Sequence, residues 1–181
     1  MDHASLAGIA FETERLRIRR LREEDATGLF AMMSDPETCA DDGGYAPTAA
    51  MDQEFMKTVA KMAQDPDRFS ILLKETGEMV GTLHLMDPIP ERAVPALEIG
   101  YCMAPAHRMQ GYGSEAVLGM VAHLHGEMKI PLVTAGAFDF NIRSQRMLEK
   151  MGFVREGVTK CAFAHPQRGI VDMVNYVHMA P

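Results

Sequence analysis

The sequence predicts one α/β domain built on a mixed, mostly antiparallel sheet of about seven strands flanked by four helices. The first observation is that strand-like segments, with a hydrophobic period of two, are interspersed along the chain with segments of helical period. The second is residues 97–126, where a strand, a glycine loop and a helix follow one another directly. A length of 181 residues with 47% hydrophobic content suffices for one core. We therefore expect a single domain over 14–181 after a flexible tail over 1–13.

Turn and cap signals set the order of these elements. Pro36 stops the first helix, Thr48 caps the second, and three prolines keep the loop 87–95 out of the sheet. Gly77 lies in a short turn whose flanking strands should pair as an antiparallel hairpin, and the last two strands should pair across 161–169. The expected strands cover 15–21, 69–74, 79–85, 97–103, 131–137, 153–160 and 170–178, and the expected helices cover 25–33, 48–64, 114–126 and 141–151.

The composition argues against several classes of protein. The 25 acidic and 18 basic residues give a formal charge of −7, which disfavours a nucleic-acid scaffold or a protein of anionic membranes. Cys39, Cys102 and Cys161 are odd in number and widely spaced, so they indicate neither a disulfide framework nor a zinc site, and we expect no metal. No segment resembles a signal peptide or a membrane span. We expect a cytoplasmic protein without a nucleic-acid or membrane partner.

The glycine loop before the third helix has the features of an anion site. Gly111 and Gly113 let the backbone approach a ligand closely. The helix start presents unpaired N–H groups and partial positive charge, which favour a phosphate, and Arg108 adds a fixed charge. The residues of this expected phosphate site are Arg108, Met109, Gln110, Gly111, Tyr112, Gly113 and Ser114.

Two phosphate-binding interpretations compete for this loop. Residues 111–116 fit the dinucleotide fingerprint G-x-G-x-x-A, but the strand that follows ends without the acidic residue which that fingerprint requires. The pattern Arg108-x-x-Gly111-x-Gly113 instead resembles motif A of the GNAT superfamily, the acetyl-CoA-dependent N-acetyltransferases. A nicotinamide enzyme is therefore the less favoured interpretation.

A second segment carries the same resemblance at the expected distance. Asn141, Ser144, Gly152 and Phe153 are spaced as in the superfamily's N-x-x-(Ser/Ala) helix that ends in Gly-Phe. The resemblance covers about residues 12 to 178. Three further features are similar to the RimJ/RimL-like branch: the strand 97–101, the arginine-rich start at 15–21, and Leu148 where many relatives carry tyrosine.

The resemblance implies a function and a cosubstrate. An acetyl group would pass from acetyl-CoA to a primary amine, of a protein N-terminus or a small molecule, by direct attack on the thioester. The pantetheine arm would lie between splayed strands 97–103 and 132–137, with a backbone N–H near the end of the first strand meeting the thioester oxygen. The expected contacts outside the loop are Tyr101, Cys102, Met103, Asn141 and Arg146, although Asn141 also suits a helix cap and Arg146 a solvated position.

The resemblance also implies the catalytic groups. Glu98 is the expected general base, acting through water, because this branch carries glutamate there; burial beside an apolar wall would raise its pKa. An ion pair with a nearby arginine is the alternative role of Glu98, and His84 is the alternative base. Ser144 or solvent would protonate the departing thiolate, since Leu148 replaces the tyrosine; Ser144 equally suits a backbone hydrogen bond.

The acceptor is the least defined partner. Asp41 and Asp42 would attract a cationic amine, and Tyr45 would lie over it by a cation–π contact, unless the segment is only a solvated turn. A homodimer is possible for this family. The alternative to an enzyme is a catalytically inactive sensor that keeps the acetyl-CoA site.

Overall fold

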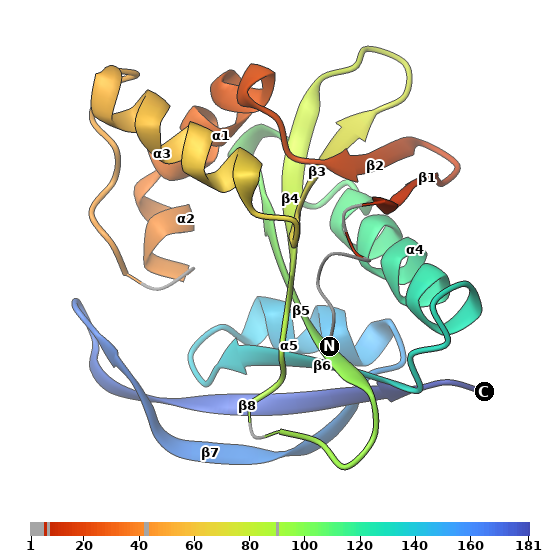
Figure 1. The fold of residues 1–181 in the computed structure, drawn as a ribbon. Helices are drawn as coiled ribbons and strands as arrows, with labels where there is room; N and C mark the ends of the chain where they lie inside the picture. Colours follow the sequence, from red (N-terminus) through yellow and green to blue (C-terminus); the bar gives the residue numbers. More distant parts are fainter. Residues whose placement is uncertain (1–5, 7, 42–43, 90) are drawn as a thin grey trace. The chain divides into compact units, whose positions relative to one another are not determined.

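The computed structural model describes residues 6, 8–41, 44–89 and 91–181 (Figure 1). By their contacts these residues form two units, one of the residues up to His84 with Tyr101–Gly119, the other of Leu85–Gly100 with Met120–Pro181. The strands are β1 (Ala10–Glu12), β2 (Leu16–Arg20), β3 (Arg68–Leu73), β4 (Met79–Met86), β5 (Ala96–Met103), β6 (Leu132–Phe138), β7 (Val154–His165) and β8 (Gly169–Met179). The helices are α1 (Ala26–Met33), α2 (Pro36–Asp41), α3 (Gln53–Gln64), α4 (Tyr112–Gly126) and α5 (Ile142–Lys150), with short 3-10 helices η2 (Glu23–Asp25) and η3 (Pro105–His107).

The strands form an eight-stranded mixed sheet in the order β1-β2-β3-β4-β5-β6-β8-β7. β5 and β6 are parallel, whereas the pairs β1–β2, β2–β3, β3–β4, β6–β8 and β7–β8 are antiparallel. The predicted fold class, α/β with a mostly antiparallel mixed sheet, is therefore confirmed, with eight strands in place of about seven.

The additional strand is β1, which lies inside the segment expected to be a flexible tail. Phe11 of β1 is paired with Ile18 of β2, and Ile9 just before the strand is buried. Pairing with β2 and the burial of Ile9 hold residues 10–12 in place, so the structure differs there from the expected tail. Residues 1–5 and 7 lie outside the described part, and the domain boundaries remain a prediction.

In the first unit, helices α1 and α3 cover one face of the antiparallel strands. Leu29 and Met32 of α1 meet Phe55 and Val59 of α3 in one buried cluster, which also includes Leu72. Phe30 and Phe55 add an edge-to-face ring contact, with centroids 5.5 Å apart. Figure 1 shows the two helices side by side. Each large side chain buried in this way stabilises the fold by about 1.5–3 kcal/mol.

The caps of these helices differ from the prediction at one point. Asp52, not Thr48, caps α3, because its side chain accepts a hydrogen bond from the N–H of Phe55 at 2.9 Å. Thr48 instead donates its backbone N–H to Met33. Pro36 ends the first helix as expected, but it also opens α2, a six-residue helix that the sequence analysis did not predict.

In the second unit, β6 lies between parallel β5 and antiparallel β8. β5 and β6 are paired only from Ala96 to Glu98 on β5 and from Leu132 to Thr134 on β6. β6 then continues to Phe138, and its pairing with β8 extends over this whole length. On one face, Tyr176 of β8 is fully buried and donates its hydroxyl to Glu149 of α5 at 3.2 Å.

The β7–β8 hairpin is longer than expected. β7 continues through most of the predicted connection 161–169 and ends at His165. Pairing is interrupted by irregularities between Arg155 and Gly157 and between Thr159 and Phe163. Such bulges interrupt the alternation of side chains between the two faces of a strand. The second bulge lies where the predicted strand stops, which is why the sequence predicts too short a strand.

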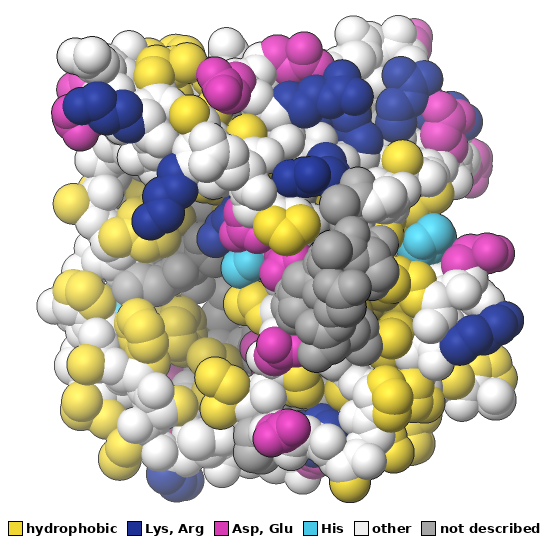
Figure 2. All heavy atoms as spheres, viewed as in Figure 1, with side chains coloured by type: hydrophobic (Ala, Val, Ile, Leu, Met, Phe, Trp, Pro, Cys, Tyr) yellow, Lys and Arg dark blue, Asp and Glu magenta, His cyan; other side chains and the backbone are white. Residues whose placement is uncertain are grey.

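Charge is distributed unevenly in spite of the negative total. Figure 2 shows Lys and Arg side chains over the N-terminal strands of the first unit, where β2 carries Arg17, Arg19 and Arg20 in sequence. Arg17 is paired with Glu12 at 2.9 Å, and Arg19 with Asp25 at 2.8 Å. Carboxylates of the same unit thus offset much of this local positive charge.

Candidate active site

The predicted phosphate loop connects η3 to the start of α4 in the first unit. Met109 and Gly111 both have positive φ, at 61° and 82°. This backbone turns the chain sharply between Arg108 and the first turn of α4, where the leading N–H groups have no acceptor within the helix. Gly113 is buried in that first turn. The loop therefore has the conformation and the helix dipole that favour an anion.

Arg15 is the basic residue that contacts this loop, and the sequence analysis did not single it out. Its Nη1 donates to the backbone oxygen of Gln110 at 3.1 Å, and its guanidinium lies 4.5 Å from the centroid of the Tyr112 ring. A Cβ placed on Gly111 would lie 3.3 Å from Arg15 Nη2. In the sequence Arg15 is simply the first residue of a charged strand start, so no local signal marks it.

Glu115, in the first turn of α4, fixes Arg15 in this position. Its carboxylate accepts hydrogen bonds from the Thr13 hydroxyl at 2.6 Å, the Arg15 N–H at 2.8 Å and Arg15 Nε at 2.6 Å. Burial alone would raise the pKa of Glu115, but these bonds outweigh it and hold that pKa below its usual value. The chain segment before β2 is thereby tied to the N-terminal end of α4.

The guanidinium of Arg108 contacts the segment around α2 in this structure. Its guanidinium pairs with Asp35 at 3.1 Å and with Glu37 at 3.2 Å, and it also donates to the hydroxyl of Thr38. The pKa of Asp35 is lowered by the Thr38 hydroxyl and by Arg108. These partners belong to α2 and the residue before it, so in this structure Arg108 braces α2 and its contact with a phosphate remains a prediction.

The end of β5 and the middle of β4 hold further predicted residues in the first unit. Tyr101, Cys102 and Met103 are half-buried. A Cβ on Gly81 of β4 would lie only 2.5 Å from the Cys102 backbone oxygen, so glycine is required for this close approach. The proposed contact of a 101–103 N–H with the thioester stays a prediction.

His84, the alternative base, lies near Asp65, with Nε2 and Oδ2 3.9 Å apart. Burial lowers the pKa of His84, and the charge of Arg68 lowers it further. Both effects favour the neutral form of the imidazole, while the charges of Asp65 and Asp67 oppose them. The role of His84 as the alternative base remains a prediction.

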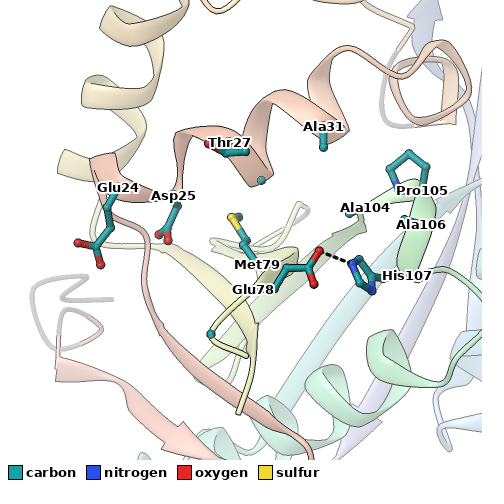
Figure 3. Close-up of a pocket in the computed structure, with 12 residues that line it drawn as sticks. Glu24, Asp25, Thr27, Ala31, Glu78, Met79, Ala104, Pro105, Ala106 and His107 are labelled. Carbon is teal, nitrogen blue, oxygen red and sulfur yellow. Dashed lines mark hydrogen bonds and ion pairs between the residues drawn. The ribbon is translucent and has the colours of Figure 1, made fainter. Parts of the chain in front are cut away.

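A cavity of about 560 Å³ in the first unit is lined by none of the predicted site residues. Figure 3 shows Glu24 and Asp25 near the start of α1, with Glu78 and His107 joined by a hydrogen bond of 3.0 Å. Burial opposes ionisation of Asp25, but bonds from Arg19, Ser70 and a backbone N–H hold its pKa below the usual value. These acids already have partners within the protein.

Glu98 lies in the second unit, on β5 beside β6. Burial raises the pKa of its carboxyl, although a hydrogen bond from the Ile89 N–H and the charge of Arg92 oppose the rise. A Cβ on Gly136 of β6 would lie 3.8 Å from Glu98 Oε1 and 2.9 Å from Met173 Sδ. The carboxylate thus lies beside a position of β6 that has no side chain.

Arg92 is the arginine whose charge acts on Glu98. Its guanidinium forms two bonds of 2.6 Å with Glu156 of β7, and it acts on Glu98 only by its charge. The alternative role of Glu98, a direct pair with an arginine, therefore does not describe this structure. The bidentate contact instead holds the loop 87–95 against β7.

The start of α5 is capped as its sequence suggests. Asn141 Oδ1 accepts a hydrogen bond from the Ser144 N–H at 3.0 Å. Ser144 is half-buried, Arg146 is exposed, and Leu148 is fully buried. The cap role of Asn141 is established in this structure, whereas its contact with pantetheine and the roles of Ser144 and Arg146 remain predictions.

The predicted acceptor residues are only partly described. Asp41 is the last residue of α2 and is half-buried, and Tyr45 is 38% exposed. Asp42 lies outside the described residues. Their role toward an amine remains a prediction. In the part of the chain that the structure covers, we find no helix long and apolar enough to cross a membrane and no group of three or more potential metal-binding side chains.

Comparison with known proteins identifies the family. A model of the acetyltransferase (GNAT) domain matches residues 15–154. The chain is 31% identical over 155 residues to the uncharacterized N-acetyltransferase YoaA of Bacillus subtilis, covering 82% of this chain and 85% of that protein. A GNAT-family acetyltransferase from Bacillus anthracis superposes with a TM-score of 0.81 at 24% identity, over 95% of this chain and 99% of that one. Spermidine N-acetyltransferase from Vibrio cholerae, solved with CoA and spermine, gives 0.75 at 15% identity over 93% and 97%.

These matches define an acyltransferase of the α/β class. The chain belongs to the GNAT family of acetyltransferases. The family uses acetyl-CoA as the acetyl donor, which favours motif A over the dinucleotide fingerprint as the interpretation of the glycine loop.

Proposed function

We propose that the protein transfers the acetyl group of acetyl-CoA to a primary amine by direct attack on the thioester, with Glu98 as general base. The observation that carries the proposal is the environment of Glu98, a half-buried carboxylate whose pKa is raised by burial beside Gly136. A carboxylate tuned toward neutral pH is suited to take a proton from an ammonium group. The RimJ/RimL-like branch, suggested by the sequence, is part of this proposal.

The loop at the start of α4 is the proposed site of the CoA pyrophosphate. The positive φ of Met109 and Gly111 and the first N–H groups of α4 suit an anion. Arg15, held beside Gln110 by Glu115, would add positive charge there. Arg108 would contribute only after exchanging its partners Asp35 and Glu37 for the phosphate.

The reaction requires proton transfers in a fixed order. The acceptor ammonium gives one proton, through water, to the Glu98 carboxylate, and the neutral amine then attacks the thioester carbon. A C–N bond forms, the carbonyl oxygen takes the negative charge, and the tetrahedral intermediate collapses with cleavage of the C–S bond. The nitrogen loses its second proton to solvent, and the thiolate gains a proton from solvent or from Ser144, which solvent then reprotonates. Glu98 finally returns its proton to solvent. The sum is one amide, one thiol and one proton released.

A cationic acceptor is the proposed substrate class. The charge of −7 favours such a partner weakly, and Asp41 with Tyr45 offers a carboxylate and an aromatic ring in the first unit. Spermidine, named for the Vibrio cholerae neighbour, and N-terminal peptides represent the two kinds of acceptor to be tested. A cytoplasmic location and a homodimer complete the proposal.

Thiol release from acetyl-CoA, measured across a panel of polyamines, simple amines and N-terminal peptides, tests the proposal. Glu98→Gln should lower kcat/KM by roughly 100-fold with the Kd for acetyl-CoA little changed, because a positioned base is lost while the shape is kept. Glu91→Gln, a change in the exposed part of the loop that precedes β5, is the matched control and should keep the wild-type rate.

Three outcomes would contradict the proposal in different ways. A Glu98→Gln enzyme with a normal rate from pH 6 to 9, together with an inactive His84→Gln enzyme, would transfer the role of base to His84. Binding of acetyl-CoA without turnover of any amine would indicate the inactive sensor. A melting temperature raised by NAD and unchanged by acetyl-CoA would indicate a nicotinamide enzyme.

A further inference from the structure

Thr134 of β6 has a buried hydroxyl that the fold does not use. The residue is 4% exposed, and its Oγ1 has no hydrogen-bond partner within the part of the chain that the structure describes. A buried hydroxyl without a partner destabilises a fold, and valine would fill the same volume without that cost. The presence of threonine at this position therefore needs a reason other than packing.

The register of the sheet places Thr134 next to the proposed base. Thr134 and Glu98 are direct partners in the parallel ladder of β5 and β6, so their side chains leave the same face of the sheet. Gly136, two residues further along β6, is on that face as well, and the Glu98 carboxylate lies beside it. The partner of Thr134 on the other side is Val177 of β8, which has no polar side-chain atom.

The other polar groups that act on Glu98 are engaged, except Arg92 Nε, which is buried without a partner among the described residues. The Ile89 N–H donates to the carboxylate, and Arg92 acts on it by charge while its guanidinium is paired with Glu156 of β7. Met173 of β8, on the far side of Gly136, is apolar. On the same face, the Thr134 hydroxyl is a polar group that still lacks a hydrogen-bond partner among the described residues.

We infer that Thr134 is a positioning residue, whose hydroxyl holds the water through which Glu98 removes the proton of the acceptor ammonium. The inference rests on the proposed function of Glu98. An ordered water needs two to four polar partners, and here they are the Glu98 carboxylate, the Thr134 hydroxyl and the ammonium. The ammonium N–H bond breaks as the water accepts its proton, and a proton of that water passes to the carboxylate. No proton is gained or lost overall, because Thr134 only accepts or donates a hydrogen bond.

Two matched pairs of variants isolate the hydroxyl. Thr134→Val keeps the shape and removes the oxygen, and Thr134→Ala and Thr134→Ser differ from each other only by that oxygen. We expect Thr134→Val and Thr134→Ala to lower kcat/KM for a charged amine by about tenfold, and Thr134→Ser to stay within about twofold of the wild type. The KM for acetyl-CoA should be unchanged in all three variants. The melting temperature of Thr134→Val should equal or exceed that of the wild type.

Two further readouts separate positioning from structure. The acid limb of the pH profile of kcat/KM should move to higher pH in Thr134→Val, because the carboxylate loses a well-ordered donor. An acceptor amine that is already neutral at the assay pH does not need the first proton transfer, so its rate should fall much less. A purely structural role would lower the rates of both acceptors equally.

The outcomes distinguish this inference from the function on which it rests. If Thr134→Val and Thr134→Ala act at the wild-type rate, or if Thr134→Ser is as slow as Thr134→Ala, the inference is wrong, provided that Glu98→Gln is slow. If Glu98→Gln is also as fast as the wild type, the assignment of the base fails first. Should Thr134→Val prove poorly folded, the comparison of Thr134→Ala with Thr134→Ser decides alone.

Discussion

Replacement of Gly111 by alanine separates backbone strain from ligand binding when it is compared with the same change at Gly77. Both glycines have positive φ, at 82° and 73°. A Cβ on Gly77 would have nothing within 4 Å, and a Cβ on Gly111 would meet only Arg15 Nη2, the end of a flexible side chain, at 3.3 Å. The two variants therefore share the conformational cost, and only one of them lies in the proposed pyrophosphate loop.

The magnitudes follow from this geometry. A left-handed backbone costs an L-residue about 1–2 kcal/mol, so the free energy of unfolding should fall by about that amount in both variants. For a domain of this size each kcal/mol corresponds to a fall in melting temperature of about 2–4 °C. Hydrogen bonds to a charged group contribute about 1.5–3 kcal/mol, so misalignment of one N–H at the loop should weaken acetyl-CoA binding roughly 10- to 100-fold in Gly111→Ala alone.

Thermal unfolding and isothermal titration with acetyl-CoA measure the two effects independently. Both variants should melt lower than the wild type by similar amounts, and only Gly111→Ala should lose affinity. If the two variants bind acetyl-CoA with the same affinity, whether that affinity is unchanged or equally reduced, the assignment of the pyrophosphate to this loop is refuted.

Three other predictions follow from the structure. Arg15→Ala should weaken acetyl-CoA binding several-fold, more at low salt, whereas Arg17→Ala should not, as titration at two ionic strengths would reveal. Because burial raises the pKa of Glu98, the folded chain retains a proton that the unfolded chain releases. The free energy of unfolding should therefore fall as the pH rises through that raised pKa. Glu98→Gln should remove this fall, as denaturation from pH 5 to 8 would show. Asp52→Ala should destabilise the protein by about 1 kcal/mol, while Thr48→Ala should have little effect on urea denaturation.

The parts of the fold that the sequence predicts well are those that local chemistry determines. The turn at Gly77 and the end of the first helix before Pro36 require particular backbone angles, which few other residues adopt. The choice of Asp52 over Thr48 as a cap depends on the backbone hydrogen bond from Thr48 to the distant Met33, which no local pattern shows. Strand β1 has three residues and exists because β2 offers it an edge.

The candidate site shows the same division. Gly111 and Glu98 are marked by motif and spacing, and the structure gives each an environment that suits its predicted role. Arg15 could not be assigned in this way, because its position depends on Glu115, which is far away in sequence. Arg108 is marked by the motif, but its ion pair with the distant Asp35 has no local signal. Thr134 is still harder to predict, since its significance lies in a hydrogen bond that the protein does not make.

The bond from the Ile89 N–H to Glu98 makes the backbone a spectroscopic reporter of the carboxyl group. The Ile89 side chain is 88% exposed, so packing of that side chain contributes little to the environment of its amide. In an NMR titration, the amide proton of Ile89 should shift downfield as Glu98 ionises, because the bond strengthens when its acceptor becomes charged. The midpoint of that shift is the pKa of the proposed base in the free protein, obtained with no acceptor amine in the tube.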